Sequence, residues 1–269
     1  MVSSAWMEDD CLMCGQREIH LHSLDCDEQM FDSYCSLLIS MASSYAIALT
    51  DEQARHCLEH LLYVEQINSY INLTSITSLD EGIILHILDS LLFMRSSAEI
   101  HLGDATFLDM GTGAGFPGVP FHIVTGYQGV LLDSVKKKVD AVQAIIDALH
   151  LQNLEVVHDR LERYAADERN QFDLVLARAL ASLPVLIEYA SPFLEEGGYL
   201  IVSKGVPTDE ELTAGDRSAQ VCGLKRIELL HLALPEDKGQ RTIITYRKIC
   251  PSLVSLPRAM GMARKHPLG

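Results

Sequence analysis

Four glycines within eight residues make one stretch of this chain suitable for holding a cofactor. The stretch reads LDMGTGAGFPG from Leu108 to Gly118 and contains G-x-G-x-x-G from Gly113 onward. Glycine permits positive φ and lets a ligand approach the backbone, and a helix N-terminus is expected directly behind the loop. Asp133 follows 22 residues after Gly111, at the end of the next apolar run, where a carboxylate can accept both ribose hydroxyls. These residues predict a cofactor that contains a nucleoside, and NAD and S-adenosylmethionine both fit.

Three features around the loop favour S-adenosylmethionine. Asp109 lies two residues before Gly111, which is the usual arrangement in methyltransferases. Two strand-like segments, 227–234 and 242–249, are joined by Pro235-Glu-Asp-Lys-Gly239, and a closing antiparallel hairpin is typical of methyltransferase sheets. The domain takes up about 200 residues and leaves no second substrate domain of the kind that a dehydrogenase carries. An NAD-type Rossmann enzyme is the alternative.

The chain from residue 105 onward alternates between apolar strand-like runs and helical segments. Such alternation predicts parallel strands joined by helical crossovers, an α/β fold of the Rossmann-like, doubly wound kind that ends in the antiparallel hairpin. The expected strands are 106–110, 130–132, 155–157, 172–176 and 199–203, and the clearest helices are 136–150 and 183–194.

Helices are also expected upstream of this region. Thr50-Asp-Glu-Gln53 and Ser78-Leu-Asp-Glu81 have the form of capping boxes, and they predict helices that run to about residue 70 and over 83–94. The uncharged stretch 33–50 contains five serines, and an amphipathic helix fits it better than a membrane span. We divide the chain into an extension that is expected to be disordered (1–29), a helical segment (30–98), a cofactor-binding domain (99–250) and a basic tail (251–269).

Composition and charge narrow the class of protein. The chain is 48% hydrophobic and 22% charged, and its acidic start, Glu8-Asp9-Asp10, is no secretory signal, so we expect a cytoplasmic protein with reduced cysteines. A net charge of −16 argues against binding to nucleic acid. However, residues 238 to 269 contain seven Lys or Arg and no Asp or Glu. This asymmetry predicts either a basic tail with a binding role or a solvated end.

A cluster of cysteine and histidine near the N-terminus has the spacing of half a zinc knuckle. Cys11 and Cys14 form C-x-x-C-G, and His20, His22 and Cys26 follow closely. No second C-x-x-C pair is present, and the spacing in an extension can be accidental. We therefore predict no metal site.

Several segments resemble one known family, in order along the chain. They are 72–74, 86–91, 108–118, 131–134, 177–179, 204–205, and 257–258 with 265–268. On these residues the sequence resembles the bacterial small-subunit (16S) ribosomal RNA guanine-N7 methyltransferases, the glucose-inhibited division protein B family, from about Phe31 to the end. One departure is Ile67-Asn68, where the family has a Trp-Asn pair.

The resemblance implies a class I S-adenosylmethionine-dependent methyltransferase that modifies N7 of a specific guanine in 16S ribosomal RNA. The substrate would be the RNA or the small ribosomal subunit, and the oligomeric state stays open. Phe116 and Leu161 can also be core residues, and Arg178 a structural ion-pair partner. The implied cofactor-binding residues are Gly111, Gly113 and Phe116 in the loop, Asp133 on the ribose, Leu161 and Glu162 at the adenine end, and Arg178 beside the methionine moiety.

The residues agree with guanine N7 as the target. Enzymes that methylate exocyclic amines carry Asn/Asp-Pro-Pro-aromatic after the fourth strand, where this chain has Ala177-Arg-Ala-Leu180, and the cysteine needed for cytosine C5 is also missing there. N7 has a nucleophilic lone pair and loses no proton, so positioning can carry catalysis and no catalytic residue is predicted. Arg258, Arg264 and Lys265 in the tail are expected to bind RNA phosphates. A non-catalytic RNA-binding relative is a further alternative.

Overall fold

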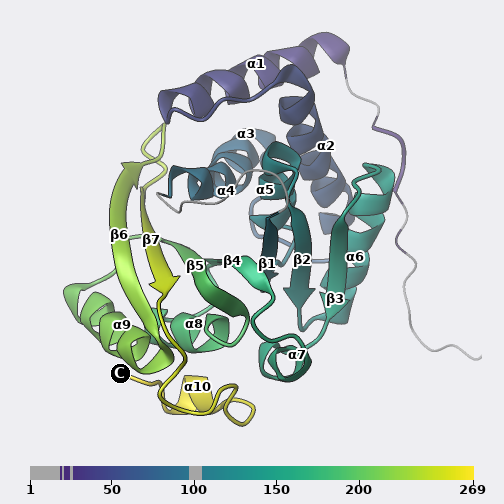
Figure 1. Cartoon of the computed structure of the whole chain (residues 1–269). Coiled ribbons are helices and arrows are strands. Elements are labelled where there is room, and N and C mark those ends of the chain that lie inside the picture. The colour runs from purple at the N-terminus through teal and green to yellow at the C-terminus, as the bar shows by residue number, and fades with distance from the viewer. Residues whose placement is uncertain (1–18, 20, 25–26, 97–104) are drawn as a thin grey trace, which may run out of the picture.

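Seven strands form one sheet in the order β3-β2-β1-β4-β5-β7-β6 (Figure 1). The computed structural model describes residues 19, 21–24, 27–96 and 105–269. Neighbouring strands pair in parallel, except that β7 is antiparallel to both β5 and β6. The strands are β1 (Thr106–Met110), β2 (Gln128–Asp133), β3 (Leu154–His158), β4 (Phe172–Arg178), β5 (Leu194–Lys204), β6 (Leu224–Ala233) and β7 (Gln240–Lys248).

The predicted α/β fold and its closing hairpin are confirmed. β6 and β7 pair along their length, and the backbone N–H of Leu234 donates to the carbonyl of Gly239 at 2.8 Å in the connecting turn. β1 has its predicted bounds, whereas β4 and β5 are longer than expected. The strand order reverses at β1, with β2 and β3 on one side and β4 on the other. In such sheets ligands bind at the carboxyl ends of the strands beside this reversal.

Helices cover both faces of the sheet and enclose two apolar cores. Successive residues of β1 belong to different cores: Phe107 packs in one core and Leu108 in the other. One face carries α1 (Glu28–Ser44), α2 (Asp51–Asn68), α5 (Gly118–Thr125) and α6 (Lys136–Ala148), and the other carries α7 (Leu161–Asp167), α8 (Leu183–Ala190) and α9 (Asp209–Cys222). In Figure 1 the C-terminal segment with α10 (Met262–Lys265) lies at the end of the molecule opposite α1.

One of the two predicted capping boxes is confirmed. Thr50 Oγ1 accepts from the N–H of Gln53 at 3.1 Å, and Gln53 Oε1 accepts from the N–H of Thr50 at 3.0 Å. Ser78 makes no side-chain capping bond, so the second prediction was wrong. The helix expected over 83–94 is broken into α3 (Leu79–Gly82), the π-helical turn η1 (Ile83–Leu88), α4 (Asp89–Leu91) and the 3-10 turn η2 (Leu92–Arg95). π-helical turns are rare and often lie at functional sites.

The start of α1 differs from the predicted boundary at residue 30. α1 begins at Glu28, and the Asp27 side chain caps it by accepting from the N–H of Met30 at 2.9 Å. The backbone N–H and carbonyl of His22 both bond to the side chain of Gln66 at 3.1 Å, which ties this part of the extension to α2. The structure does not describe four residues of the predicted cysteine and histidine cluster, namely Cys11, Cys14, His20 and Cys26. The segment up to residue 18, which is expected to be disordered, also lies outside the described residues.

Two further findings concern the described part of the chain only. None of its helices is long and apolar enough to cross a membrane. None of its histidine, cysteine and acidic side chains gather in a group that could hold a metal ion.

Candidate cofactor site

The glycine loop after β1 is fixed by hydrogen bonds to the end of β2. Gly111 has a φ of +76°, and its N–H donates to the carbonyl of Leu132 at 2.8 Å. Gly113 has a φ of +63°, and its N–H donates to Asp133 Oδ2 at 3.0 Å. Asp133 Oδ1 accepts from the N–H of Val135 at 2.8 Å. Each carboxylate oxygen has capacity for a second bond, so Asp133 can hold the loop and still accept ribose hydroxyls.

Asp109 is buried under the loop and marks its inner side. Its Oδ2 accepts from the N–H of Gly118, the first residue of α5, at 2.9 Å. Among the described residues, Asp109 Oδ1 and Thr112 Oγ1 are buried without a hydrogen-bond partner. Burial raises the pKa of Asp109 to about 6, against the opposing effects of the Thr112 side chain and of the hydrogen bond from Gly118. Neither Asp109 nor Thr112 lines the pocket at this loop, so both lie in the protein beneath it.

A pocket of ≈ 240 Å³ opens at the carboxyl ends of β1, β2 and β3. Its lining contains four of the seven predicted cofactor residues, namely Gly111, Asp133, Leu161 and Glu162. Gly113 does not line the pocket, but its N–H donates to Asp133, which does. The pocket therefore brings together the loop, the carboxylate of Asp133 and the first turn of α7, and the binding of a ribose by Asp133 stays a prediction.

Phe116 lies in the core and not in the wall of this pocket. It is 5% exposed, and its ring stacks on that of His86 at a centroid distance of 4.6 Å and an angle of 7°. The ring of His60 lies on Phe116 at 4.4 Å, and His60 Nε2 donates to the carbonyl of Ala114 at 2.9 Å. Burial lowers the pKa of His60 to about 3 and that of His86 to about 4, so both rings are neutral near pH 7. Phe116 thus supports the glycine loop from beneath.

Arg178, at the end of β4, is held by the helical segment that contains η1. Its guanidinium donates to Asp89 Oδ2 at 3.1 Å and to the carbonyl of Leu85 at 3.2 Å, and lies 5.6 Å from the centroid of the Phe116 ring. The other oxygen of Asp89 accepts from Arg241 Nε at 2.9 Å. Arg178 does not line the ≈ 240 Å³ pocket, and this agrees with the alternative of a structural ion pair. The expected contact with the methionine moiety stays a prediction.

The three tail residues predicted to bind RNA have three different surroundings. Arg258 donates to both carboxylate oxygens of Glu188, at 2.7 and 2.6 Å, and Glu188 is 3% exposed. This bidentate pair gives Arg258 a structural partner within the protein, and its expected contact with phosphate stays a prediction. Arg264 is exposed but lines the cofactor pocket. Lys265 is exposed and remains available for phosphate.

The donor set of the ≈ 240 Å³ pocket fits S-adenosylmethionine. A Cβ on Gly111 would lie 2.7 Å from the Leu180 side chain, which lines the same pocket. Any larger residue at position 111 would therefore take up space in the pocket. Asp133 supplies acceptors for a ribose. Glu162 uses Oε1 for bonds within the protein, and its Oε2 accepts no hydrogen bond from the described residues, so it can accept from an adenine amine.

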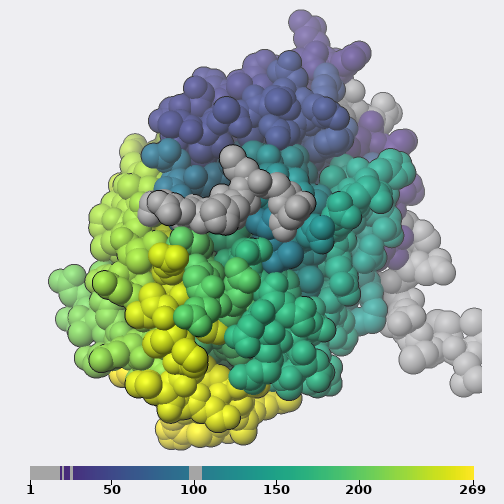
Figure 2. Space-filling model, viewed as in Figure 1, coloured from purple at the N-terminus to yellow at the C-terminus, as the bar shows by residue number. Residues whose placement is uncertain are grey.

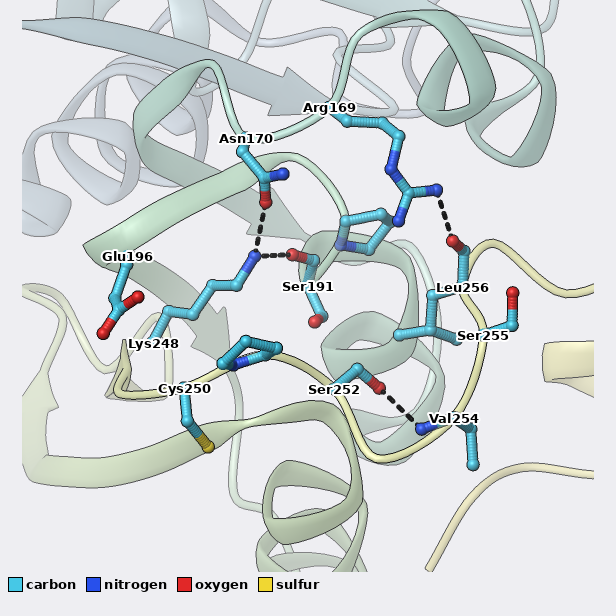
Figure 3. A pocket seen from close by; sticks show the side chains of 12 residues that line it. Arg169, Asn170, Ser191, Glu196, Lys248, Cys250, Ser252, Val254, Ser255 and Leu256 are labelled. Carbon is cyan, nitrogen blue, oxygen red and sulfur yellow. Dashed lines mark hydrogen bonds between the residues drawn. The ribbon is translucent and has the colours of Figure 1, made fainter.

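A larger pocket of ≈ 380 Å³ lies at the opposite edge of the parallel strands (Figure 3). The segments that lead into β4 and β5 line it together with the end of β7 and the residues that follow. Lys248 Nζ donates to Asn170 Oδ1 at 2.9 Å and to the carbonyls of Ser191 and Leu194 at 2.8 and 2.6 Å. All three N–H groups of this lysine are used inside the protein. The pocket lies away from the glycine loop, and we assign the chemistry to the smaller pocket.

Several residues at the site were not identified from the sequence. His86 and Asp89 belong to the matching segment 86–91, but their residue types and spacing indicate no role. The sequence around His60, Tyr189 and Gly261 likewise indicates no role at the site. The last three residues each bond to a partner at least 25 positions away in the chain. His60 and Ala114, for example, are 54 positions apart. Spacing along the sequence therefore carries no signal for these three residues.

The strand order, the antiparallel β7 and the loop-and-carboxylate pocket define a class I S-adenosylmethionine-dependent methyltransferase. Residues 53–243 match the profile of the family described as rRNA small subunit methyltransferase G. The chain belongs to this family.

Two relatives agree with this assignment, and one solved structure shares the fold. The chain is 34% identical over 229 residues to the ribosomal RNA small subunit methyltransferase G of Lactobacillus acidophilus, and the match covers 84% of this chain and 95% of that protein. It is 40% identical over 204 residues to the protein of the same name from Lachnoclostridium phytofermentans, with 75% and 84% covered. The crystal structure of MtNAS in complex with MTA and tNA shares the fold, with a TM-score of 0.50 and 14% identity over 84% of this chain and 78% of that one.

Proposed function

We propose that this chain transfers the methyl group of S-adenosylmethionine to N7 of a specific guanine in 16S ribosomal RNA, and that it does so in the cytoplasm. The observation that carries the proposal is the pocket in which Gly111, Asp133 and Glu162 come together at the carboxyl ends of β1 to β3. The name shared by the relatives, ribosomal RNA small subunit methyltransferase G, supports the RNA as substrate.

The residues of the pocket have binding roles in this reaction. Asp133 accepts the ribose hydroxyls, Leu161 and Glu162 contact the adenine end, and Gly111 leaves space for the backbone to approach the cofactor. S-adenosylmethionine supplies a methyl group on a sulfonium, which is electrophilic without further activation. The N7 lone pair of guanine would form the new bond to the methyl carbon as the bond from that carbon to sulfur breaks, which leaves S-adenosylhomocysteine. No proton leaves N7, so no general base is needed. The carboxylates of Asp133 and Glu162 already accept internal hydrogen bonds, in agreement with a holding role.

Exposed lysines near the pocket are candidates for phosphate contacts. Lys265 follows Arg264, which lines the pocket, and Lys137 lies in the exposed first turn of α6, directly after β2. Such contacts give affinity and register on RNA without reading base identity. The base itself would be selected by the shape of the surface around the methyl group.

Mass mapping of 16S ribosomal RNA from cells with and without the gene tests the proposal. One guanine should lose a single methyl group in cells without the gene, and a plasmid copy should restore it. An unchanged methylation pattern would contradict the proposal. A titration of the purified chain with S-adenosylhomocysteine and with NAD separates it from the dehydrogenase alternative, because only the former should bind.

A further inference from the structure

We infer that the C-terminal segment 257–265 is part of the cofactor site, and that the Arg264 guanidinium contacts the adenosine of the bound cofactor. The inference rests on the proposed function, because it concerns the same pocket. It changes the role expected of this segment, from a strip that meets only RNA to a wall of the pocket that holds S-adenosylmethionine.

An ion pair with α8 anchors the segment. Arg258 Nε and Nη2 donate to the two oxygens of Glu188 at 2.7 and 2.6 Å, and Nη2 also donates to the carbonyl of His266 at 2.7 Å. One arginine therefore joins both ends of the stretch to a buried carboxylate. A bidentate pair of this kind fixes position as well as adding energy. Figure 2 shows the residues of this segment packed on the body of the molecule at its lower edge.

A second contact joins the segment to the residue expected at the adenine. The N–H of Gly261 donates to Glu162 Oε1 at 2.9 Å, and the Tyr189 hydroxyl donates to the same oxygen at 3.3 Å. Gly261 has a φ of +78°, which glycine adopts without strain, and Ala263 on the following turn is 2% exposed. The chain therefore turns at Gly261, on the first turn of α7, and the short helix α10 follows.

This turn places Arg264 in the pocket wall. Arg264 and Gly261 line the pocket together with Asp133 and Glu162, which are expected at the ribose and the adenine. Tyr189 lines the same pocket, and its pKa is raised by burial and by the Glu162 carboxylate, while Arg264 opposes this rise. A planar guanidinium at this place can stack on the face of an adenine. Lys265, the next residue, is exposed and does not line the pocket.

Calorimetric titration with two probes tests this inference. S-adenosylhomocysteine contains the adenosine and the amino acid, whereas 5′-methylthioadenosine lacks the amino acid. Arg264→Ala should weaken binding of both probes by a similar factor, roughly tenfold, because the lost contact is to the adenosine that they share. Lys265→Ala is the matched control and should change neither affinity by more than about twofold, as expected for an exposed residue outside the pocket.

Each other outcome has a definite meaning. Unchanged affinity of Arg264→Ala for both probes would overturn the inference, as would a loss confined to S-adenosylhomocysteine, which would place the guanidinium on the amino acid. Failure of the unaltered protein to bind either probe would instead contradict the proposed function. Arg264 is exposed, so the variant should keep the melting temperature of the parent, and this is measured beside each titration.

Discussion

The carboxylate of Asp133 accepts a hydrogen bond from the backbone N–H of Gly113, with 3.0 Å between the nitrogen and Oδ2. The residue expected to hold the ribose therefore also fixes the loop that approaches the rest of the cofactor. Two parts of the site that are 20 positions apart in the chain depend on one side chain.

Asp133→Ala should weaken binding of S-adenosylhomocysteine by at least about thirtyfold. Two ribose hydrogen bonds to a charged acceptor are lost, at roughly 1 kcal/mol or more each, and the Gly113 N–H loses its partner. Calorimetric titration measures the effect. Asp140→Ala is the control, because Asp140 forms an exposed pair with Lys136 on the neighbouring helix. Equal affinities of the Asp133 variant and the parent would remove Asp133 from the site.

Gly111→Ala should weaken cofactor binding, because its Cβ would lie 2.7 Å from Leu180 and displace that side chain in the wall of the pocket. Gly126→Ala is a matched control: its φ of +71° is close to the +76° of Gly111, and its Cβ would meet nothing within 4 Å. Both variants should lose about 1 kcal/mol of unfolding free energy through backbone strain. Titration should show normal cofactor affinity for the Gly126 variant alone. Loss of binding in both would attribute the effect to general destabilisation.

Arg258→Ala should lower the free energy of unfolding by about 3–5 kcal/mol, because it leaves the Glu188 carboxylate buried without a partner. Urea unfolding measures this loss, and the double variant Arg258→Met, Glu188→Leu should recover most of it. Lys265→Ala provides the contrast, with unchanged stability and a salt slope of RNA binding lower by about one unit. Unchanged stability of Arg258→Ala would contradict the structural role of this ion pair.

Stability should fall in acid, partly because of His60. Burial lowers its pKa from 6.5 to about 3, so its contribution is complete above pH 6.5 and is lost as the pH falls toward 3. His60→Gln should make the unfolding free energy less dependent on pH between 6 and 4, by up to about 1.4 kcal/mol per pH unit. Urea unfolding at several pH values measures the slope.

The parent protein, measured under the same conditions, is the reference for this slope. The comparison with the parent is needed because Asp109 has the opposite effect on the pH dependence of the unfolding free energy. Burial raises its pKa from 3.8 to about 6, so its contribution is present at low pH and is lost as the pH rises toward 6. Equal slopes for His60→Gln and the parent would contradict a buried neutral ring.

The sequence predicted features that depend on local pattern. The glycine loop, Asp133 at the end of β2 and the antiparallel hairpin have local signatures, and all three are present in the structure. Contacts between residues that are distant in the chain have no such local signature. Arg258 pairs with Glu188 from 70 positions away, and the tail reaches Glu162 across 99.

The π-helical turn Ile83–Leu88 was also missed, because a regular helix and a π turn share nearly the same apolar pattern. The consequence is local but important for the site, since this turn carries His86 against Phe116. Phe116 was expected in the pocket for its place in the loop. The two histidine rings that enclose it come from α2 and η1, and the sequence of the loop contains no trace of them.

Chemical cleavage of the RNA product tests the central claim most directly. The purified chain is incubated with S-adenosylmethionine and small ribosomal subunits from cells that lack the gene, and the 16S RNA is then reduced and treated with aniline, which cuts at N7-methylguanosine. We predict one new cut at a single guanine, present with the parent protein and absent with Asp133→Ala. Methyl transfer without such a cut, or a cut made equally well by the Asp133 variant, would contradict the account.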